Sequence, residues 1–135
     1  MAERKKILVV DDYKIIVETI VQALEEDENG YDLISAADGC EAELQVARFK
    51  PDLIILDPDI SGYEMCMKTQ SDPSVKDIKI IVLSAYLNEE AFLQMRTRGA
   101  DACFSKPFPL THLKREVARL LGLEKCGQGR GEERR

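Results

Sequence analysis

The chain has 135 residues, of which 44% are hydrophobic and 33% are charged. This composition is typical of one globular domain of roughly 100–200 residues, and it excludes intrinsic disorder and collagen-like repeats. The net charge of −6 disfavours direct binding to nucleic acid, which requires clustered Lys and Arg. No apolar run approaches the roughly 18 residues that span a bilayer, and the start of the chain has no signal-type cleavage site. We therefore expect a cytoplasmic protein that binds neither membrane nor nucleic acid directly.

The four cysteines are Cys40, Cys66, Cys103 and Cys126, and they lie 26, 37 and 23 residues apart. No two of them form a Cys-x-x-Cys pair, so the spacing indicates neither a zinc site nor a disulfide framework. We expect buried or incidental thiols.

Five short apolar, β-branched runs predict strands. They are Ile7–Val10, Leu33–Ile34, Leu53–Leu56, Ile78–Leu83 and, more weakly, Ala102–Phe104. The third and fourth runs are continuous rather than alternating, which is typical of strands covered on both faces of a parallel sheet.

Stretches with helical spacing lie between these strands. Their repeating positions are Ile16, Ile20, Ala23 and Leu24; Ala42, Val46 and Phe49; Phe92, Met95 and Gly99; and Leu110, Leu113, Val117, Leu120 and Leu121. Residues 62–69 could form a further short helix, and Pro109 lies near the start of the last one, where a missing N–H costs nothing. The acidic run Glu25–Glu28 is expected at the solvated end of the first helix, where it opposes the helix dipole. The alternation predicts an α/β fold with right-handed crossovers around a parallel sheet.

The composition changes at Gly122. The last 14 residues hold four of the eight glycines and seven charges, so we expect a folded body over residues 4–121 and a flexible polar tail over residues 122–135. With no internal repeat or interdomain linker, we expect no separate output domain.

Polar residues stand where four of the predicted strands end. They are Asp11 and Asp12, Asp57, Ser84 and Lys106. Ligands of an open α/β sheet bind outside the carboxyl ends of the strands, so these side chains are expected to share one pocket. Clustered carboxylates repel one another unless a cation joins them, and hard oxygen ligands favour Mg²⁺, with Mn²⁺ as the other possibility. Lys106 and Ser84 could then bind phosphoryl oxygens while Asp57 acts as a nucleophile that forms an aspartyl phosphate.

Four motifs in register resemble the receiver domains of two-component response regulators, and in particular the single-domain chemotaxis type. The matching stretches are ILVVDDY, DLIILDPDISGYE, IIVLSAY and CFSKPF. The resemblance implies a flavodoxin-like, doubly wound (βα)5 fold whose five-stranded parallel sheet has the order 2-1-3-4-5.

The resemblance also implies a role for each site residue. Asp57 would be the phospho-acceptor, and Ser84 and Lys106 would contact the phosphoryl group. The Mg²⁺ ligands would be Asp11, Asp12, Asp57 and the backbone carbonyl of Asp59. The donor would be a histidine kinase or a histidine phosphotransfer protein, and the domain would signal by phosphorylation-dependent binding of a downstream protein. It would catalyse only its own phosphorylation and dephosphorylation.

The chain departs from the family pattern at several positions. Ser61 stands where family members commonly have proline, and Cys103 replaces the aromatic residue that usually switches position on activation. Phe104 and Tyr86 are the candidates to replace that ring. Pro58 removes a backbone N–H directly after the acceptor. Asp59 and Tyr86 occupy positions that, by resemblance, tune the phosphoryl lifetime.

Two other functions are compatible with the sequence. One is a degenerate receiver that binds its partner without phosphorylation, motivated by Pro58, Ser61 and Cys103. The other is a small phosphatase, because Asp57-Pro58-Asp59 resembles the Asp-x-Asp motif of haloacid-dehalogenase-type hydrolases. Its paired carboxylates, however, precede the nucleophile here, and the chain has no cap insertion.

Simpler structural roles compete with the functional ones at individual residues. Asp11 and Asp12 could cap the first helix, and Ser84 could satisfy backbone groups at its strand end. His112, the one histidine of the chain, is expected to be a solvated helix residue rather than a metal ligand.

Overall fold

The computed structural model describes residues 4–57, 77–84, 89–97 and 99–123. Its strands are β1 (Lys6–Val10), β2 (Asp32–Ala36), β3 (Leu53–Leu56), β4 (Lys79–Ser84) and β5 (Ala102–Ser105). The described helices are α1 (Lys14–Glu25), α2 (Gly39–Phe49), α4 (Glu89–Thr97) and α5 (Leu110–Leu120). All five predicted strands are confirmed. The short helix predicted over residues 62–69 lies outside the described residues.

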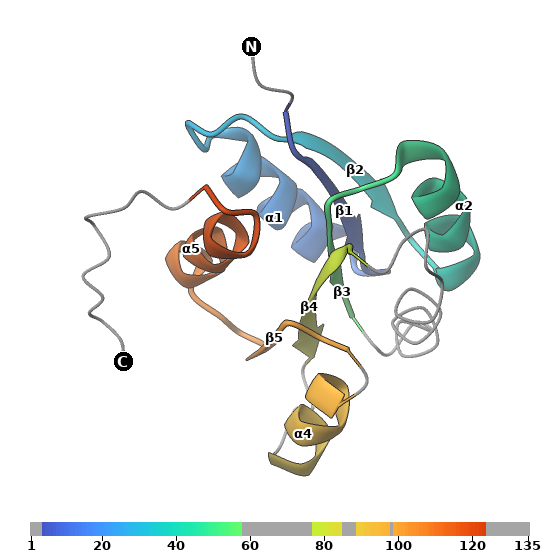
Figure 1. Ribbon diagram of the computed structural model, residues 1–135, viewed down its shortest axis with the longest axis vertical. Coiled ribbons are helices and arrows are strands. Elements are labelled where there is room, and N and C mark those ends of the chain that lie inside the picture. The colour runs from blue at the N-terminus through green and yellow to red at the C-terminus, as the bar shows by residue number, and fades with distance from the viewer. Residues whose placement is uncertain (1–3, 58–76, 85–88, 98, 124–135) are drawn as a thin grey trace.

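The five strands form one parallel sheet in the order β2-β1-β3-β4-β5, as the resemblance implied. Figure 1 shows α1 and α5 side by side on one face of this sheet and α2 on the other. The central strand β3 is buried at every position, which explains its continuous apolar sequence. The predicted α/β fold and strand order are therefore confirmed. No helix within the described ranges has the length and apolarity needed to cross a membrane.

One helix prediction is wrong at its end. The predicted helical stretch with Phe92 and Met95 included Gly99, but α4 ends at Thr97 and Gly99 has a φ of +112°. This left-handed backbone is accessible to glycine because it has no Cβ, and it lets the chain turn into β5. Gly99 is thus a helix terminator and no part of the apolar stripe.

Helix α2 begins with a reciprocal cap. The carboxylate of Asp38 accepts a hydrogen bond from the backbone N–H of Glu41 at 2.8 Å. The Glu41 carboxylate in turn accepts one from the backbone N–H of Ala37 at 2.9 Å. One backbone donor of the first helical turn, at Glu41, and one just before the N-cap, at Ala37, are thereby satisfied.

Asp38→Ala is expected to lower the free energy of unfolding by about 1 kcal/mol, because it removes this cap. Urea denaturation followed by circular dichroism measures the change. Asp38→Asn is the matched control, since asparagine caps helices about as well as aspartate and should keep near wild-type stability. Equal losses in both variants would contradict a capping role.

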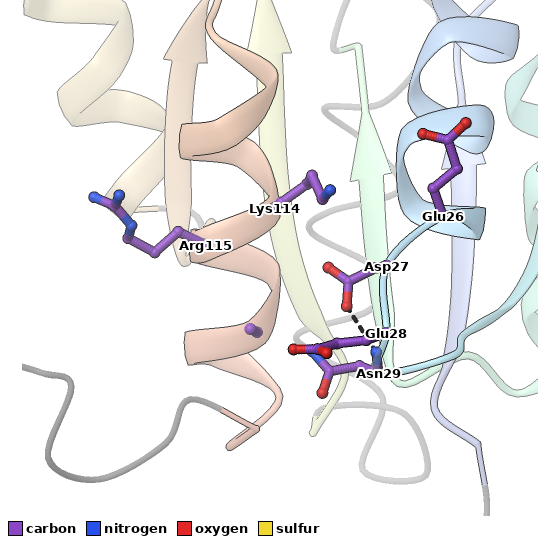
Figure 2. Close-up of a pocket in the computed structure, with 7 residues that line it drawn as sticks. Glu26, Asp27, Glu28, Asn29, Lys114 and Arg115 are labelled. Carbon is purple, nitrogen blue, oxygen red and sulfur yellow. Dashed lines mark hydrogen bonds between the residues drawn. The ribbon is translucent and has the colours of Figure 1, made fainter.

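Unlike the capped N-terminus of α2, the C-terminal end of helix α1 carries charges that oppose the helix dipole. Its last turn contains no basic residue, and the acidic run Glu25–Glu28 covers its C-terminal end, with Glu26 as the C-cap. Figure 2 shows Glu26, Asp27 and Glu28 beside the middle of α5. The prediction that this run lies at the solvated end of the first helix is confirmed for Glu25, Glu26 and Glu28, which are exposed, while Asp27 is half-buried.

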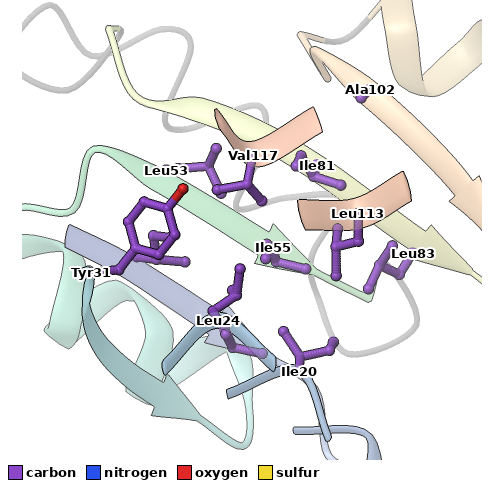
Figure 3. Close-up of a cluster of buried hydrophobic side chains, with 12 residues drawn as sticks. Ile20, Leu24, Tyr31, Leu53, Ile55, Ile81, Leu83, Ala102, Leu113 and Val117 are labelled. Atoms are coloured by element: carbon purple, nitrogen blue, oxygen red, sulfur yellow. The ribbon is translucent and has the colours of Figure 1, made fainter. Parts of the chain in front are cut away.

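The sheet separates two apolar cores, because alternate strand residues point to opposite faces. The core beneath α1 and α5 is drawn in Figure 3 and contains Ile7, Val9, Ile20, Leu24, Tyr31, Leu53, Ile55, Ile81, Leu83, Ala102, Leu113 and Val117. The core on the α2 face includes Leu8, Val10, Ala42, Val46, Ile54, Leu56, Ile80 and Val82. Two buried layers hold the strands rigidly, so the residues at their carboxyl ends have fixed relative positions.

Two carboxylates fix the strand register at the other edge of the sheet. Asp52 and Asp101 each directly precede a strand, and each bonds to the neighbouring strand through both its backbone and its side chain. Asp52 Oδ2 accepts from the Lys6 N–H at 2.9 Å, and Asp101 Oδ2 accepts from the Ile80 N–H at 2.8 Å. A slip by one residue would break these bonds and turn the apolar side chains outward.

Candidate functional site

The candidate site lies at the carboxyl ends of β1, β3, β4 and β5, which are consecutive neighbours in the sheet. Backbone hydrogen bonds continue the sheet one step beyond the strands. The Asp57 N–H donates to the Val10 carbonyl at 3.0 Å, and the Lys106 N–H donates to the Ser84 carbonyl at 2.9 Å. These bonds place the first polar residue after each strand at the same edge.

A single ammonium group joins two of the carboxylates. Lys106 Nζ donates to Asp11 Oδ2 and to Asp57 Oδ2, both at 2.9 Å. The side chains are 15%, 3% and 9% exposed respectively, so the ion-paired group is largely withdrawn from water. The structure thus brings together three residues from three strand ends, as the sequence predicts for Asp11, Asp57 and Lys106.

The orientation of Asp11 comes from the turn that follows it. Its second oxygen, Oδ1, accepts a hydrogen bond from the backbone N–H of Tyr13 at 2.9 Å. Tyr13 is itself the N-cap of α1, and that cap makes no side-chain hydrogen bond. The alternative in which Asp11 and Asp12 cap the first helix is therefore wrong. Asp11 instead closes an Asx-type turn, which aims Oδ2 at Lys106.

The charge of Lys106 is stabilised by its two partners. Burial by itself lowers the pKa of this ammonium, but hydrogen bonds and Coulomb attraction from Asp11 and Asp57 outweigh burial and raise the pKa. The group is therefore positively charged at neutral pH. Two carboxylates and one ammonium still leave an excess negative charge, which a divalent cation could neutralise.

The remaining predicted ligands differ in how the structure places them. Ser84 is 5% exposed at the end of β4, whereas Asp12 is exposed. Asp59, whose carbonyl the resemblance assigns to the metal, lies outside the described residues, as do Pro58, Ser61 and Tyr86. Within the described ranges, no three His, Cys, Asp or Glu side chains alone form a group that could hold a metal. The buried carboxylate oxygens of Asp11 and Asp57 nevertheless have the hard-donor chemistry that suits Mg²⁺.

Strand β5 places Cys103 and Phe104 on opposite faces of the sheet. Cys103 packs against the core on the α2 face, and burial raises the pKa of its thiol although Arg96 opposes this. Phe104 packs against the core beneath α1 and α5, where its ring lies 6.4 Å from that of Phe108. Phe104 therefore cannot occupy the place of the aromatic ring that Cys103 replaces. The other candidate, Tyr86, lies outside the described residues.

His112 is exposed in the first turn of α5, where the sequence predicts a solvated residue. Its side chain takes no part in the hydrogen bonds that join Asp11, Asp57 and Lys106. It is not needed to explain the site.

Comparison with known proteins identifies the family. Residues 7–118 match the family model of the response regulator receiver domain. The chain is 39% identical over 132 residues to the phosphate regulon transcriptional regulatory protein PhoB of Pseudomonas aeruginosa, covering 95% of this chain and 56% of that protein. The chain spans about half the length of the curated relatives that it matches.

Solved structures agree with this match. A putative response regulator from Chloroflexus aurantiacus superposes with a TM-score of 0.80 and 30% identity, covering 89% of this chain and 99% of that one. The phosphorylated cyanobacterial phytochrome response regulator RcpA gives a TM-score of 0.77 and 27% identity, covering 91% and 98%. The family resemblance predicted from the four motifs is confirmed. This chain, with its acidic strand ends joined by Lys106, belongs to the receiver-domain family of two-component response regulators.

Proposed function

We propose that Asp57 accepts a phosphoryl group from a histidine kinase or a histidine phosphotransfer protein, and that the domain then signals by binding a downstream protein. One observation carries the proposal: the Lys106 ammonium lies 2.9 Å from carboxylate oxygens of both Asp11 and Asp57 in a largely buried cluster. Receiver domains of response regulators are phosphorylated by histidine kinases and are signalling modules rather than conventional enzymes. Catalysis by this domain would concern only its own phosphorylation and dephosphorylation.

The transfer would be a nucleophilic displacement at phosphorus. A carboxylate oxygen of Asp57 forms a bond to phosphorus, the bond from phosphorus to the donor histidine nitrogen breaks, and the imidazole keeps the bonding electron pair and takes up a proton. Lys106 already contacts Asp57 and can neutralise a phosphoryl oxygen. The Ser84 hydroxyl, at the end of the adjacent strand β4, can donate a hydrogen bond to another oxygen.

Mg²⁺ belongs to the same proposal, with Mn²⁺ as a substitute. The family generally uses Mg²⁺ at its phosphorylation site. Asp11, Asp57, Asp12 and the Asp59 carbonyl would hold the ion, which would supply positive charge to the transferring phosphoryl group. The excess negative charge left beside Lys106 supports this assignment.

The test is to incubate the protein with Mg²⁺ and acetyl phosphate at neutral pH and to record its intact mass. We expect one phosphoryl addition that is lost without Mg²⁺ and lost in Asp57→Asn. Asp38→Asn is the matched carboxylate-to-amide control, because Asp38 lies at the N-terminus of α2, where asparagine keeps the cap, and should accept the phosphoryl group as wild type does. An Asp57→Asn protein that is phosphorylated as fast as wild type would overturn the proposal.

Other outcomes, two of which need additional measurements, would favour the two alternative functions. No phosphoryl addition, together with partner binding that Asp57→Asn leaves unchanged, would favour the degenerate receiver. The replacement of the usual aromatic residue by Cys103 on β5 is the described feature that motivates this alternative. Repeated turnover of a small phosphomonoester, abolished by Asp59→Asn, would instead indicate the phosphatase. The predicted cytoplasmic location and absence of direct nucleic-acid binding remain part of the proposal for this chain.

A further inference from the structure

The side of α2 that faces away from the sheet is apolar. The helix covers the sheet face opposite α1 and α5 (Figure 1), where it buries Ala42 and Val46. Cys40, Leu44 and Ala47 are exposed, and the exposed fraction of Leu44 is 50%. Because each residue turns a helix by about 100°, these three side chains lie within about 60° of one another, on the side opposite the buried pair. They form the outer strip of α2, at a place where a surface helix usually has charged and polar residues.

Two charges of opposite sign lie beside the outer strip. Glu41 is in the first turn of α2 and Arg48 is in the last turn, and both are exposed. Because two helical turns separate them, they lie on the same flank of the helix about 10 Å apart, with Leu44 between them. Within the described ranges, Arg48 forms no ion pair. Glu41 accepts from the Ala37 N–H through Oε1, and its carboxylate can accept from a partner through the other oxygen.

The order acidic, apolar, basic along α2 is complementary to its own reverse. If two copies of the helix pack antiparallel about a two-fold axis at Leu44, the Leu44 side chains of the two copies meet. Rotation about this axis keeps the charged flanks of both helices on the same side of the pair. Glu41 of each copy then lies opposite Arg48 of the other. A parallel arrangement would instead place like charges beside each other.

This pattern favours a second copy of the chain over other partners. A purely acidic partner helix would face Glu41, a purely basic one would face Arg48, and an uncharged one would leave both without an ion pair. The helix that fits has an exposed apolar residue between a basic and an acidic residue, in the reverse order. Helix α2 of another copy presents these groups.

We propose that two copies of the chain associate through α2, packed antiparallel, with Leu44 at the two-fold axis and one Glu41–Arg48 ion pair on each side of it. The outer strip provides the apolar contact, and the ion pairs fix the antiparallel direction. One helix from each copy gives a small interface, so the dimer is weak and forms at high protein concentration. The contact does not use Asp57, and its failure would leave the proposed phosphorylation untouched.

Sedimentation equilibrium of the full chain over a range of protein concentrations tests the proposal. We expect a monomer–dimer equilibrium, and Leu44→Glu should raise the dimer dissociation constant about tenfold or more, because it places two carboxylates at the centre of the interface. Ile15→Glu is the matched control, since Ile15 is 62% exposed on α1, and it should dimerise as wild type does. A wild-type protein that is monomeric up to about 1 mM, or a dimer that Leu44→Glu leaves unchanged, overturns the proposal.

Charge exchange tests the antiparallel direction. Arg48→Glu and, separately, Glu41→Arg should each weaken the dimer, because like charges then face each other on both sides of the axis. Mixing the two variants should produce a heterodimer, since each of its two pairs again has opposite charges. Lys14→Glu, at an exposed position on α1, is the control for the change in net charge. A mixture that stays monomeric, or a control that weakens the dimer as much as Arg48→Glu does, contradicts the proposed packing.

Cross-linking tests the position of the two-fold axis. Side chains on such an axis contact their own copies, so Leu44→Cys should form a disulfide-linked dimer under mild oxidation. Both this variant and its control, Ile15→Cys, are made in a Cys40→Ser background, because Cys40 is also exposed on α2. Non-reducing electrophoresis measures the linked fraction. Equal linkage in the two variants would contradict a two-fold axis at Leu44.

Discussion

Lys106→Met is expected to lower the free energy of unfolding by about 3 kcal/mol at neutral pH, because it removes one partner of a buried ionic cluster. The Lys106 side chain is 15% exposed, and the two carboxylates that it joins are 3% and 9% exposed. Methionine fills a similar volume, so the loss comes mainly from two nearby carboxylates that no longer share the ammonium. Urea denaturation of both proteins measures it.

Two further variants test whether the loss of stability in Lys106→Met comes from its ion pairs with Asp11 and Asp57. Lys14→Met removes an exposed lysine at the start of α1 and should change stability by less than about 0.5 kcal/mol. Adding Asp57→Asn to Lys106→Met should restore part of the loss, because only one carboxylate then remains beside the missing ammonium. Equal destabilisation by Lys14→Met and Lys106→Met would contradict the role assigned to the cluster.

The stability that Lys106 contributes changes with pH in a definite direction. Because folding raises the pKa of Lys106 above the ordinary value of 10.5, the folded state binds this proton more tightly than the unfolded state does. The stability that Lys106 contributes is therefore fully present below pH 10.5 and is lost as the pH rises through the raised pKa. The difference between wild type and Lys106→Met should stay constant from neutral pH to that point and decrease above it.

The sequence predicted which residues lie at the site, because the end of a strand can be recognised from the few residues around it. A continuous apolar run such as Leu53–Leu56 can be buried on both faces only between two helical layers. The residue that follows each run then lies at the carboxyl end of the parallel sheet. Asp57 and Lys106 follow from that rule. The wrong prediction that Gly99 belongs to a helix has an equally local cause. Helical spacing counts positions only, and it does not take into account that glycine commonly ends helices.

The sequence did not predict the orientation of the side chains of Asp11 and Asp12. Asp11 and Asp12 are chemically identical neighbours, yet Asp11 is buried against Lys106 and Asp12 is exposed. The difference arises from the turn in which the Tyr13 N–H holds one oxygen of Asp11. An aspartate two residues before a helix N-cap is a weak signal for such a turn, and it gains force only when the start of the helix is known.

The alternation of side chains along β5 decides whether Phe104 can replace the ring missing at Cys103. Successive strand residues point to opposite faces, so Cys103 and Phe104 cannot exchange places without a shift of the whole strand. The structure confirms this, with Cys103 against one core and Phe104 against the other. On the face that Cys103 occupies, the position next to Val82 on β4 therefore holds a thiol and no aromatic ring.

Lys106→Met is also expected to bind Mg²⁺ about tenfold more tightly than wild type does. Two charges near 4 Å apart interact by about 4 kcal/mol at the effective dielectric of a partly buried site, so a fixed ammonium strongly disfavours a dication beside it. Lys106 Nζ contacts one carboxylate oxygen each of Asp11 and Asp57, the two buried carboxylates that would hold the metal. Part of the gain is offset because the two carboxylates are held less firmly without Lys106.

Isothermal titration with MgCl₂ measures this affinity, with Lys14→Met as the control that should match wild type. An unchanged affinity in Lys106→Met would mean that the ammonium and the metal occupy separate positions beside Asp11 and Asp57. The two cations would then act on a phosphoryl group together rather than in competition for the same carboxylate oxygens.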